Sequence, residues 1–374
     1  MNISKPPRIE VATPHVGQEE IDAVAEVLRS GRYASGPRVE AFEKAFADYI
    51  GVNHACAVSN GTSALFIAME AMGIGEGDEV LVPALTFFAS VSSILYLRAK
   101  PVFVDIEPDG LCMSPEHAAS VITDKTRAIM PVHLFGAAAH MDAINALAAR
   151  NGLMVIEDCA QSHGTRYGDR VTGSLGTAGA FSFFATKHMT TGEGGMITTN
   201  DPAIDAKARI LRSHGMTGRD DHSELAYNNR MNEIAAAIGL VQLAKLEDLN
   251  RRRVDNSLYL IDNLKDLEWC EFPLPLDEKR GHTFFWCPLL VPEDKGSINA
   301  LKKHLDAHNI GYRHRYSAPL YRQEALRKAG LDYSNLYLPN VERIAGRVIG
   351  LPNHPGLARD ELDRVIEAVR SFRP

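Results

Sequence analysis

Lys187 has the surroundings of a reactive lysine. It follows an apolar run, Phe181 to Phe184, and precedes a glycine-rich turn with the sequence TTGEGG. An amine held at the end of a buried strand loses hydration, which disfavours the ammonium form and frees the nucleophilic amine. The alternative is a solvated surface lysine, which fits most of the 40 lysine and arginine residues but not this segment. The context therefore predicts an amine that can do chemistry.

Polar and aromatic side chains follow several other apolar runs of the sequence. They are Gly61, Thr62, Ser63, Phe87, Asp158, Gln161 and Ser182, and His133 lies at the end of a further run, still within it. In an open parallel sheet the carboxyl ends of the strands meet at one edge, where ligands bind. We therefore expect these residues to share one site with Lys187.

Each of these residues also has a purely structural interpretation. Ser and Thr often cap the start of a helix, but the free N–H groups there also bind anions, so the segment 61–63 fits both roles evenly. Asp158 could cap a turn, yet it ends the run Leu153 to Ile156, and buried carboxylates are usually paired. Phe87 alone fits a core position, and His133 alone fits a hydrogen-bonded core histidine.

Taken together, the residues predict a site for pyridoxal phosphate. The aldehyde of this cofactor needs a lysine, and its pyridine nitrogen needs an acidic partner. The phosphate needs a helix N-terminus and hydroxyl groups. The ring needs an aromatic or apolar platform. Lys187, Asp158, the segment 61–63 and Phe87 supply these four requirements.

The elements that must position these residues alternate along the first 230 residues. The apolar runs are 55–58, 79–83, 101–105, 128–134, 154–157, 180–184 and 196–199, and the helix patterns are 20–29, 39–49, 62–72, 88–97 and 141–150. Short apolar strands that alternate with helices indicate an α/β fold with a mostly parallel, doubly wound sheet. Continuously apolar strands indicate that helices cover both faces of this seven-stranded sheet.

The pattern changes after about residue 230. The later elements are predicted as a helix over 233–253, a strand over 284–291, a helix over 298–309, a strand over 310–316 and a helix over 359–371. We predict a large cofactor-binding α/β domain over residues 1–250 and a small C-terminal α+β domain over 251–374. The basic run Arg251 to Arg253 is expected on a solvated helix face.

Composition excludes several classes of protein. The chain has 374 residues, 45% of them hydrophobic, and a formal net charge of −7, which argues against a nucleic-acid-binding protein. Five dispersed cysteines without a CxxC pair favour a reducing compartment. We find no apolar signal core and no run of the roughly 18 apolar residues that a membrane span needs, so we expect a cytoplasmic protein. His304 and His308 are expected on the surface and not in a metal site.

The motifs around these residues resemble the DegT/StrS family of pyridoxal phosphate-dependent sugar aminotransferases. The resemblance covers nearly the whole chain and includes the segments AVSNGTSAL, VPALTFFAS, IEDCAQSHG, FSFFATKHMTTGEGG and YNNRMNE. It implies the aspartate-aminotransferase fold, fold type I. By this resemblance, Lys187 would form a Schiff base with the cofactor and then move the proton between cofactor and substrate.

The resemblance implies roles for the other residues as well. Asp158 would pair with the pyridine nitrogen, and Phe87 would stack on the ring. Gln161 would lie near the ring hydroxyl, and the phosphate would be held by Gly61, Thr62, Ser63 and Ser182. Contacts with the sugar-nucleotide substrate are implied for His188, His314, Arg315 and Tyr316.

The resemblance also implies a homodimer with shared active sites, in which Asn228 would reach the phosphate in the partner subunit. Arg230, in the same motif, would have a structural role. The family more often has a glycine before the tyrosine of this motif and an aromatic residue after the asparagine. This chain has Ala226 and Asn229 at those positions.

The expected reaction is transfer of an amino group from glutamate to a keto-sugar nucleotide. We expect a 4-keto-6-deoxy sugar first and a 3-keto sugar second. One branch of the family has histidine in place of the lysine and dehydrates sugars, so Lys187 favours transamination. The alternatives are a cyclitol aminotransferase or sugar dehydratase of the same fold, a non-catalytic cofactor-binding regulator, and a sugar-nucleotide-binding protein without the cofactor.

Overall fold

A seven-stranded sheet forms the centre of the computed structural model, which describes residues 7–273, 278–293 and 295–373. The strand order is β1-β9-β8-β5-β4-β2-β3. The strands are β1 (His54–Val58), β2 (Glu79–Pro83), β3 (Lys100–Val104), β4 (Thr126–Ile129), β5 (Met154–Asp158), β8 (Ala178–Ser182) and β9 (Gly195–Thr199). Only β9 runs antiparallel to its neighbours in the sheet. The predicted mostly parallel sheet is confirmed.

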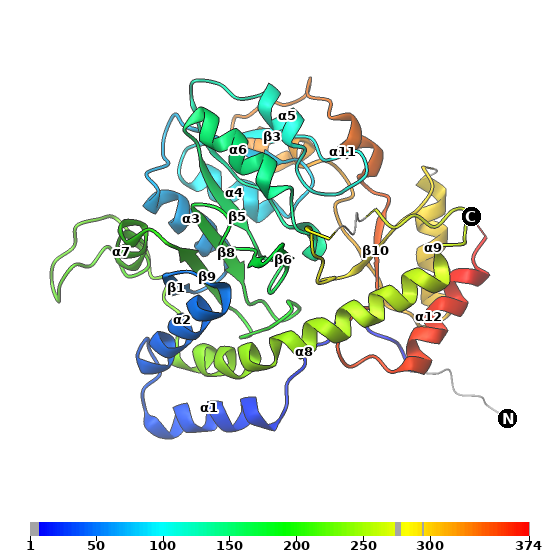
Figure 1. Cartoon of the computed structure of the whole chain (residues 1–374), viewed down its shortest axis with the longest axis horizontal. Helices are drawn as coiled ribbons and strands as arrows, with labels where there is room; N and C mark the ends of the chain where they lie inside the picture. The colour runs from blue at the N-terminus through cyan, green and yellow to red at the C-terminus, as the bar shows by residue number, and fades with distance from the viewer. Residues whose placement is uncertain (1–6, 274–277, 294, 374) are drawn as a thin grey trace.

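Helices cover both faces of the sheet, which gives three layers (Figure 1). One face packs against α3 (Gly61–Ala71), α4 (Phe88–Tyr96) and α7 (Pro202–Leu211). The other face packs against α2 (Pro37–Ile50), α5 (Pro115–Ser120) and α6 (Met141–Asn151). Along β1, Cys56 and Val58 face the first layer and Ala55 and Ala57 face the second, the alternation expected of a strand covered on both sides.

The helix α8 (Glu233–Leu264) runs from the sheet into a second hydrophobic core (Figure 1). α1 (Gln18–Ser30) and α2 pack on it near the sheet, and its residues Leu260 and Leu264 lie in the second core. The predicted domain boundary at residue 250 lies within this continuous helix. No helix in the described part of the chain, α8 included, is long and apolar enough to cross a membrane.

The second core is built around a three-stranded sheet of order β10-β12-β11. Its strands and helices are β10 (Cys287–Leu290), β11 (Arg313–His314), β12 (Val348–Leu351), α9 (Lys295–Ala307) and α12 (Arg359–Ser371). Ile9 from the start of the chain also lies in this core. Short elements complete the fold: β6 (Arg166–Tyr167), β7 (Arg170–Val171), η1 (Leu134–Gly136), η2 (Leu320–Arg322), α10 (Glu324–Lys328) and α11 (Pro339–Ile344).

The predicted strand over 128–134 is wrong beyond Ile129. Pro131 has no N–H to donate to a neighbouring strand, and Phe135 has a φ angle of 55° within the short helix η1. His133 therefore follows the strand and does not lie within it. The predicted strand over 310–316 is likewise reduced to β11, where only two residues pair with β12.

The basic run at 251–253 is only partly on a solvated face. Arg251 and Arg252 form ion pairs with Asp248 at the surface. Arg253 is buried and donates from Nη1 to the carbonyl oxygen of Asn353 at 2.6 Å, so the prediction is wrong for this residue. The helix continues past its predicted end at residue 253 because its next turns pack into the second core. The charged residues at 251–253 obscure this continuation in the sequence.

Candidate active site

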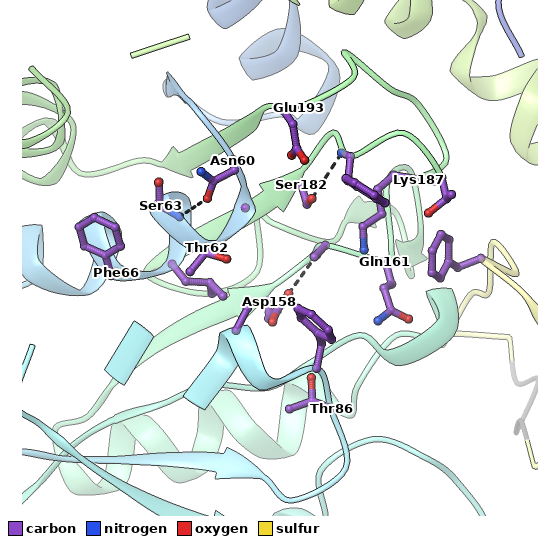
Figure 2. A pocket seen from close by; sticks show the side chains of 18 of the residues that line it. Asn60, Thr62, Ser63, Phe66, Thr86, Asp158, Gln161, Ser182, Lys187 and Glu193 are labelled. Carbon is purple, nitrogen blue, oxygen red and sulfur yellow. Dashed lines mark hydrogen bonds between the residues drawn. The ribbon is translucent and has the colours of Figure 1, made fainter. Parts of the chain in front are cut away.

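A pocket of about 740 Å³ opens at the carboxyl edge of the parallel strands (Figure 2). Its walls contain ten of the residues that the sequence analysis assigned to one site: Gly61, Thr62, Ser63, Phe87, Asp158, Gln161, Ser182, Lys187, Arg315 and Tyr316. They come from the starts of α3 and α4, the ends of β5 and β8, the loops that follow these two strands, and the segment after β11. Residues far apart in the sequence thus face one volume, of the size of a small-molecule site.

Lys187 lies in the loop that joins β8 to β9. Phe183 anchors the base of this loop, because its N–H donates to Gly194 at 2.8 Å and its carbonyl oxygen accepts from the N–H of Thr191 at 3.0 Å. The Nζ atom of Lys187 lies 4.8 Å from the ring centroid of Phe285. Burial lowers the pKa of this amine to about 8, against the opposing effect of the Asp158 carboxylate. Lys187 is therefore a better nucleophile near neutral pH than an exposed lysine.

Asp158 ends β5 and lines the same pocket as Lys187 (Figure 2). Ser90 Oγ donates to its Oδ2 at 2.8 Å, and the N–H of Ala160 donates to its Oδ1 at 3.1 Å. Burial raises the pKa of this carboxyl, although both hydrogen bonds and the Lys187 amine lower it. Both hydrogen bonds of the Asp158 side chain come from uncharged donors, and no lysine or arginine of the described residues forms one with it. A protonated pyridine nitrogen would supply the opposite charge that this buried carboxylate lacks.

The N-terminus of α3 lies at one end of the pocket. Asn60 caps the helix, and its Oδ1 accepts from the N–H of Ser63 at 2.8 Å. The earlier N–H groups, those of Gly61 and Thr62, have no acceptor within the helix, as at any helix start. The hydroxyls of Thr62 and Ser182 line the same end. The Ser63 N–H, which was expected to bind the phosphate, instead donates to the side chain of Asn60.

Two glycines let α3 approach the sheet closely enough to form this end. A Cβ atom on Gly61 would lie 2.6 Å from Cβ of Ser182. A Cβ atom on Gly195, at the start of β9, would lie 2.3 Å from the carbonyl oxygen of Asn60. Either side chain would push α3 away from β8 and β9. The glycines thus keep the hydroxyls of Thr62 and Ser182 on one side of the pocket.

Gln161 and Tyr316 join the sheet part of the pocket to the segment after β11. Gln161 Oε1 accepts from the N–H of Phe135 at 3.0 Å, and its Nε2 donates to the hydroxyl of Tyr316 at 3.0 Å. Burial raises the pKa of Tyr316 to about 12, so its hydroxyl stays protonated. Arg315 lines the pocket from an exposed position and has no side-chain partner in the part of the chain that the structure describes.

Two predicted substrate contacts do not line the pocket. His188 is buried behind the Lys187 loop, where its ring lies 5.5 Å from that of His163 and 5.7 Å from that of Phe285 between centroids. His314 donates from Nε2 to the carbonyl oxygen of Gly346 at 3.0 Å. His188 is buried and His314 is half-buried, and neither lines the pocket, so the structure does not bring them to a ligand there.

Asn228 also lies outside the pocket of its own chain, on an exposed segment. Its Oδ1 accepts from Nε of Arg230 at 3.1 Å. This bond supports the structural role predicted for Arg230, because it orients the amide. The Nδ2 group of Asn228 is a donor without a hydrogen-bond partner among the described residues, on an exposed side chain.

Several residues of the pocket were missed by sequence analysis. They are Phe66, Tyr96, Glu193, Phe285 and Trp286. Phe285 and Trp286 stack with centroids 4.8 Å apart and come from the segment before β10, where they match an ordinary strand pattern. Glu193 belongs to the GEGG motif next to Lys187, and that motif was a signal that could have identified it.

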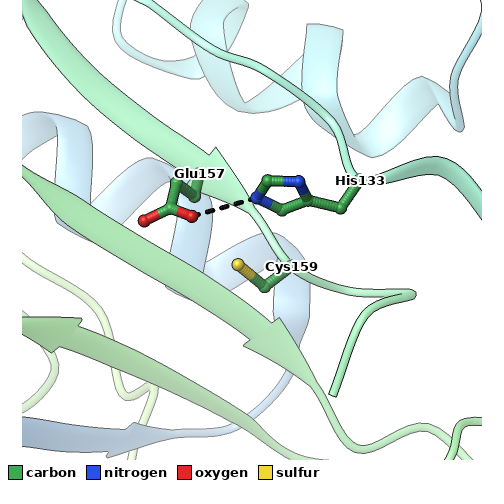
Figure 3. A group of neighbouring side chains, drawn as sticks. All are labelled: His133, Glu157 and Cys159. Atoms are coloured by element: carbon green, nitrogen blue, oxygen red, sulfur yellow. Dashed lines mark hydrogen bonds and ion pairs between the residues drawn. The ribbon is translucent and has the colours of Figure 1, made fainter. Parts of the chain in front are cut away.

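Glu157 and Cys159, the sequence neighbours of Asp158, form a buried group with His133 (Figure 3). Their ligand atoms all lie within 4.8 Å of one another, a spacing that a metal ion could use. The Glu157 carboxylate, however, already accepts from Nε2 of His133 at 3.0 Å and from three N–H groups of the loop 173–176 at 2.7 to 2.9 Å. Burial keeps the pKa of the Cys159 thiol well above its usual range. The Glu157 carboxylate therefore fixes the loop 173–176. His133 does not line the pocket, so it does not share the site with Lys187, and its role is that of a hydrogen-bonded core histidine.

Comparison with known proteins agrees with the geometry of the site. A family model for the DegT/DnrJ/EryC1/StrS aminotransferase family matches residues 14–370. The chain belongs to this family. It is a pyridoxal phosphate-dependent sugar aminotransferase of fold type I.

This DegT/DnrJ/EryC1/StrS aminotransferase has relatives that match over nearly their whole length. It is 38% identical to the spore coat polysaccharide biosynthesis protein SpsC of Bacillus subtilis (strain 168), over 96% of this chain and 95% of that protein. It is 38% identical to GDP-perosamine synthase of Caulobacter vibrioides, over 97% and 98% of the two chains. The putative sugar aminotransferase Spr1654 from Streptococcus pneumoniae, solved in its PLP form, matches with a TM-score of 0.92 and 28% identity over 97% and 98% of the chains.

Proposed function

We propose that this aminotransferase transfers an amino group from glutamate to the ketone of a nucleotide-linked sugar, with 4-keto-6-deoxy sugars first and 3-keto sugars second. The observation that carries the proposal is a single pocket that holds the Lys187 amine, the Asp158 carboxylate and, at its rim, Arg315. The relative named GDP-perosamine synthase supports a nucleotide-linked acceptor.

The residues of the pocket fit the cofactor at each of its functional groups. Pyridoxal phosphate, when bound, supplies the electron sink of the reaction. Lys187 would hold the cofactor and then carry the proton between donor and acceptor atoms, and Asp158 would hold a proton at the ring nitrogen. Phe87, which is 59% exposed at the start of α4, would cover the ring face, and Gln161 would lie near the ring hydroxyl. The phosphate would be bound by Gly61, Thr62 and Ser182.

The rim of the pocket suits the nucleotide part of the acceptor. The guanidinium of Arg315 matches phosphate oxygens in geometry and charge. Tyr96 and Phe66 line the same pocket, with ring centroids 6.2 Å apart, and offer apolar faces to a base or sugar. An acceptor with a diphosphate should therefore gain affinity from Arg315 that a free sugar or a cyclitol cannot gain.

The function is tested with a panel of acceptors and two arginine variants. Glutamate should convert the bound cofactor to its amino form, and a keto-sugar nucleotide should restore it with an aminated product. Arg315→Ala should raise the KM for the nucleotide acceptor about tenfold with little change in kcat, because a charge-assisted hydrogen bond is lost at the rim. Steady-state kinetics measure both constants. Arg313→Ala is the matched control, since Arg313 lies two residues earlier and does not line the pocket.

The outcomes separate the alternatives. Amination of cyclitol ketones alone would replace the sugar-nucleotide proposal. A dehydrated product without a new amine would indicate a dehydratase. A bound cofactor whose spectrum ignores glutamate and every other amino donor would indicate a regulator. Equal effects of the two arginine variants on KM would show that Arg315 does not contact the acceptor.

We also propose a homodimer in which Asn228 reaches the partner's active site. The exposed Nδ2 donor of Asn228 supports this, because its own pocket lies elsewhere. Leu225 and Tyr227 on the same segment are 98% and 75% exposed, which suits a surface that another subunit covers.

Complementation between two inactive variants tests the shared site. Lys187→Ala and Asn228→Ala subunits that are unfolded together and refolded should form mixed dimers with one intact site each. With random pairing, about a quarter of the wild-type activity should return. Each variant refolded alone is the control. If Asn228 acts within its own subunit, the mixture will stay as inactive as the two controls.

We place the enzyme in the cytoplasm. All five cysteines are free and buried, which suits a reducing compartment. Burial raises the pKa of the Cys56 and Cys287 thiols to about 12, so these thiols stay protonated and unreactive at neutral pH. Fractionation of the source cells that finds the protein mainly outside the cytoplasm would contradict this assignment.

A further inference from the structure

Two hydroxyl groups connect the start of α4 to the carboxylate of Asp158. Ser90 Oγ donates to Asp158 Oδ2 at 2.8 Å, and Thr86 Oγ1 lies 3.1 Å from Ser90 Oγ. Thr86, Ser90 and Asp158 are 1%, 0% and 5% exposed, so bulk water cannot replace either bond. Neither the motifs nor the comparisons assign a role to Ser90.

The direction of both bonds follows from the count of donors. An ionised carboxylate only accepts hydrogen bonds, so the single hydroxyl proton of Ser90 points at Asp158. The proton between Thr86 and Ser90 must then come from Thr86. Ser90 accepts one bond while it donates the other, and such a chain strengthens the bond that it donates.

This chain fixes the rotation of the carboxylate. The backbone of β5 sets the place of Asp158, but the last torsion of an aspartate has a broad, shallow preference. Ser90 holds Oδ2, and the N–H of Ala160 holds Oδ1 at 3.1 Å. Each oxygen keeps one lone pair, and these two lone pairs are available to a ligand in the pocket.

The same short segment also presents the proposed ring platform. Phe87 is the N-cap residue of α4, and Ser90 is the third residue of the helix. The first turn of α4 therefore determines both the position of the Phe87 ring and the orientation of the Asp158 carboxylate. The positive end of the helix dipole lies at this turn and adds to the stabilisation of the charged form of Asp158.

We propose that Ser90, held by Thr86, is a positioning residue that orients the Asp158 carboxylate toward the pyridine nitrogen of the cofactor. This rests on the role proposed for Asp158. The other groups that act on the carboxylate are the N–H of Ala160, the Lys187 amine and the His133 ring. None of these three bonds Oδ2 in the structure, so none of them replaces the Ser90 hydroxyl.

The test is Ser90→Ala with two readouts besides activity. With cofactor labelled with ¹⁵N in the ring, the nitrogen resonance of the wild-type holoenzyme should report a protonated ring. In the variant it should move toward the unprotonated position. The dissociation constant of the cofactor should rise about tenfold, as expected when a hydrogen bond to a charged group is lost. Thr86→Val should give a smaller change in the same direction, because Ser90 keeps its own proton.

Ser93→Ala is the matched control. Ser93 lies on the same helix, is also 0% exposed, and donates its hydroxyl to the carbonyl oxygen of Ser90 at 3.1 Å and not to a carboxylate. It should keep the wild-type resonance and cofactor affinity, and Ser90→Thr should restore both. If Ser90→Ala and Ser93→Ala give the same resonance, the inference is wrong even though the wild type transaminates. A wild type that does not react with glutamate would instead refute the proposed donor and leave the resonance comparison valid.

Discussion

Replacing Lys187 by alanine is expected to lower turnover by at least about 10⁴-fold, because covalent attachment and proton transfer are lost together. Among the residues that the structure describes, Lys187 is the only lysine that lines the pocket. Reduction of the wild-type holoenzyme with borohydride should leave the cofactor mass on the peptide that contains Lys187. The alanine variant should show no such mass.

Lys187→Arg separates the effect of the nucleophilic amine from the effect of the positive charge. It keeps a positive side chain in the pocket, but a guanidinium does not lose its proton at working pH and is a poor nucleophile. We expect it to be as inactive as the alanine variant. Substantial turnover with arginine at this position would mean that the charge is sufficient and that the assigned chemistry is wrong.

The pH dependence of the amine supports the same assignment. The pKa of Lys187 is lowered to about 8, whereas exposed lysines titrate near 10.4. Below pH 8 the amine is mostly protonated, and its neutral fraction rises as the pH passes upward through 8. Brief acylation of the apoprotein, followed by mass spectrometry, should show Lys187 labelling with a midpoint near pH 8. A midpoint near 10 would show that burial does not activate this lysine.

Asp158→Asn is the second variant with a large expected effect. Turnover should fall about 10³-fold, within the range found for groups that hold a catalytic proton. The amide has nearly the shape of the carboxylate, but it cannot stabilise a positive charge on the ring nitrogen. Its N–H₂ group would also face Ser90 or the N–H of Ala160, both of which are donors. Stopped-flow measurement of the reaction with glutamate reports the loss directly.

Asp105→Asn distinguishes lost chemistry from lost stability. Asp105 follows β3, is 3% exposed, and accepts from the N–H groups of Asn340 at 3.0 Å and Val341 at 2.8 Å. It does not line the pocket. We expect this variant to unfold at a lower temperature while keeping its turnover per folded site. If both variants lose turnover in proportion to their loss of stability, the role proposed for Asp158 is structural only.

The placement of Asp158 and Lys187 could be predicted because it depends on a general property of parallel sheets. Residues that follow neighbouring strands meet at one edge, and β5 and β8 are neighbours in the sheet. The position of β9 could not be predicted in the same way. It lies antiparallel between β1 and β8, although it follows β8 in the chain like any other strand.

Other parts of the site were hidden because their partners are distant in sequence. Ser90 lies in a helix pattern, and its acceptor is 68 residues further along the chain. Phe285 and Trp286 match a strand, and only the packing of the second part of the chain brings them to Lys187. His188 adjoins Lys187 in sequence, yet the loop turns its ring into the interior, so proximity along the chain was misleading.

Gly61 shows how little sequence variation the proposed phosphate-binding end of this pocket allows. Its backbone N–H is one of the proposed ligands, but a single added carbon atom would collide with Ser182 before any ligand is considered. Gly195 has the same limit against Asn60, although it does not line the pocket. Among descendants of this enzyme, loss of either glycine would therefore mimic loss of a cofactor ligand. Selection at these two positions acts on the distance between a helix and a sheet, and the catalytic phenotype follows from that distance.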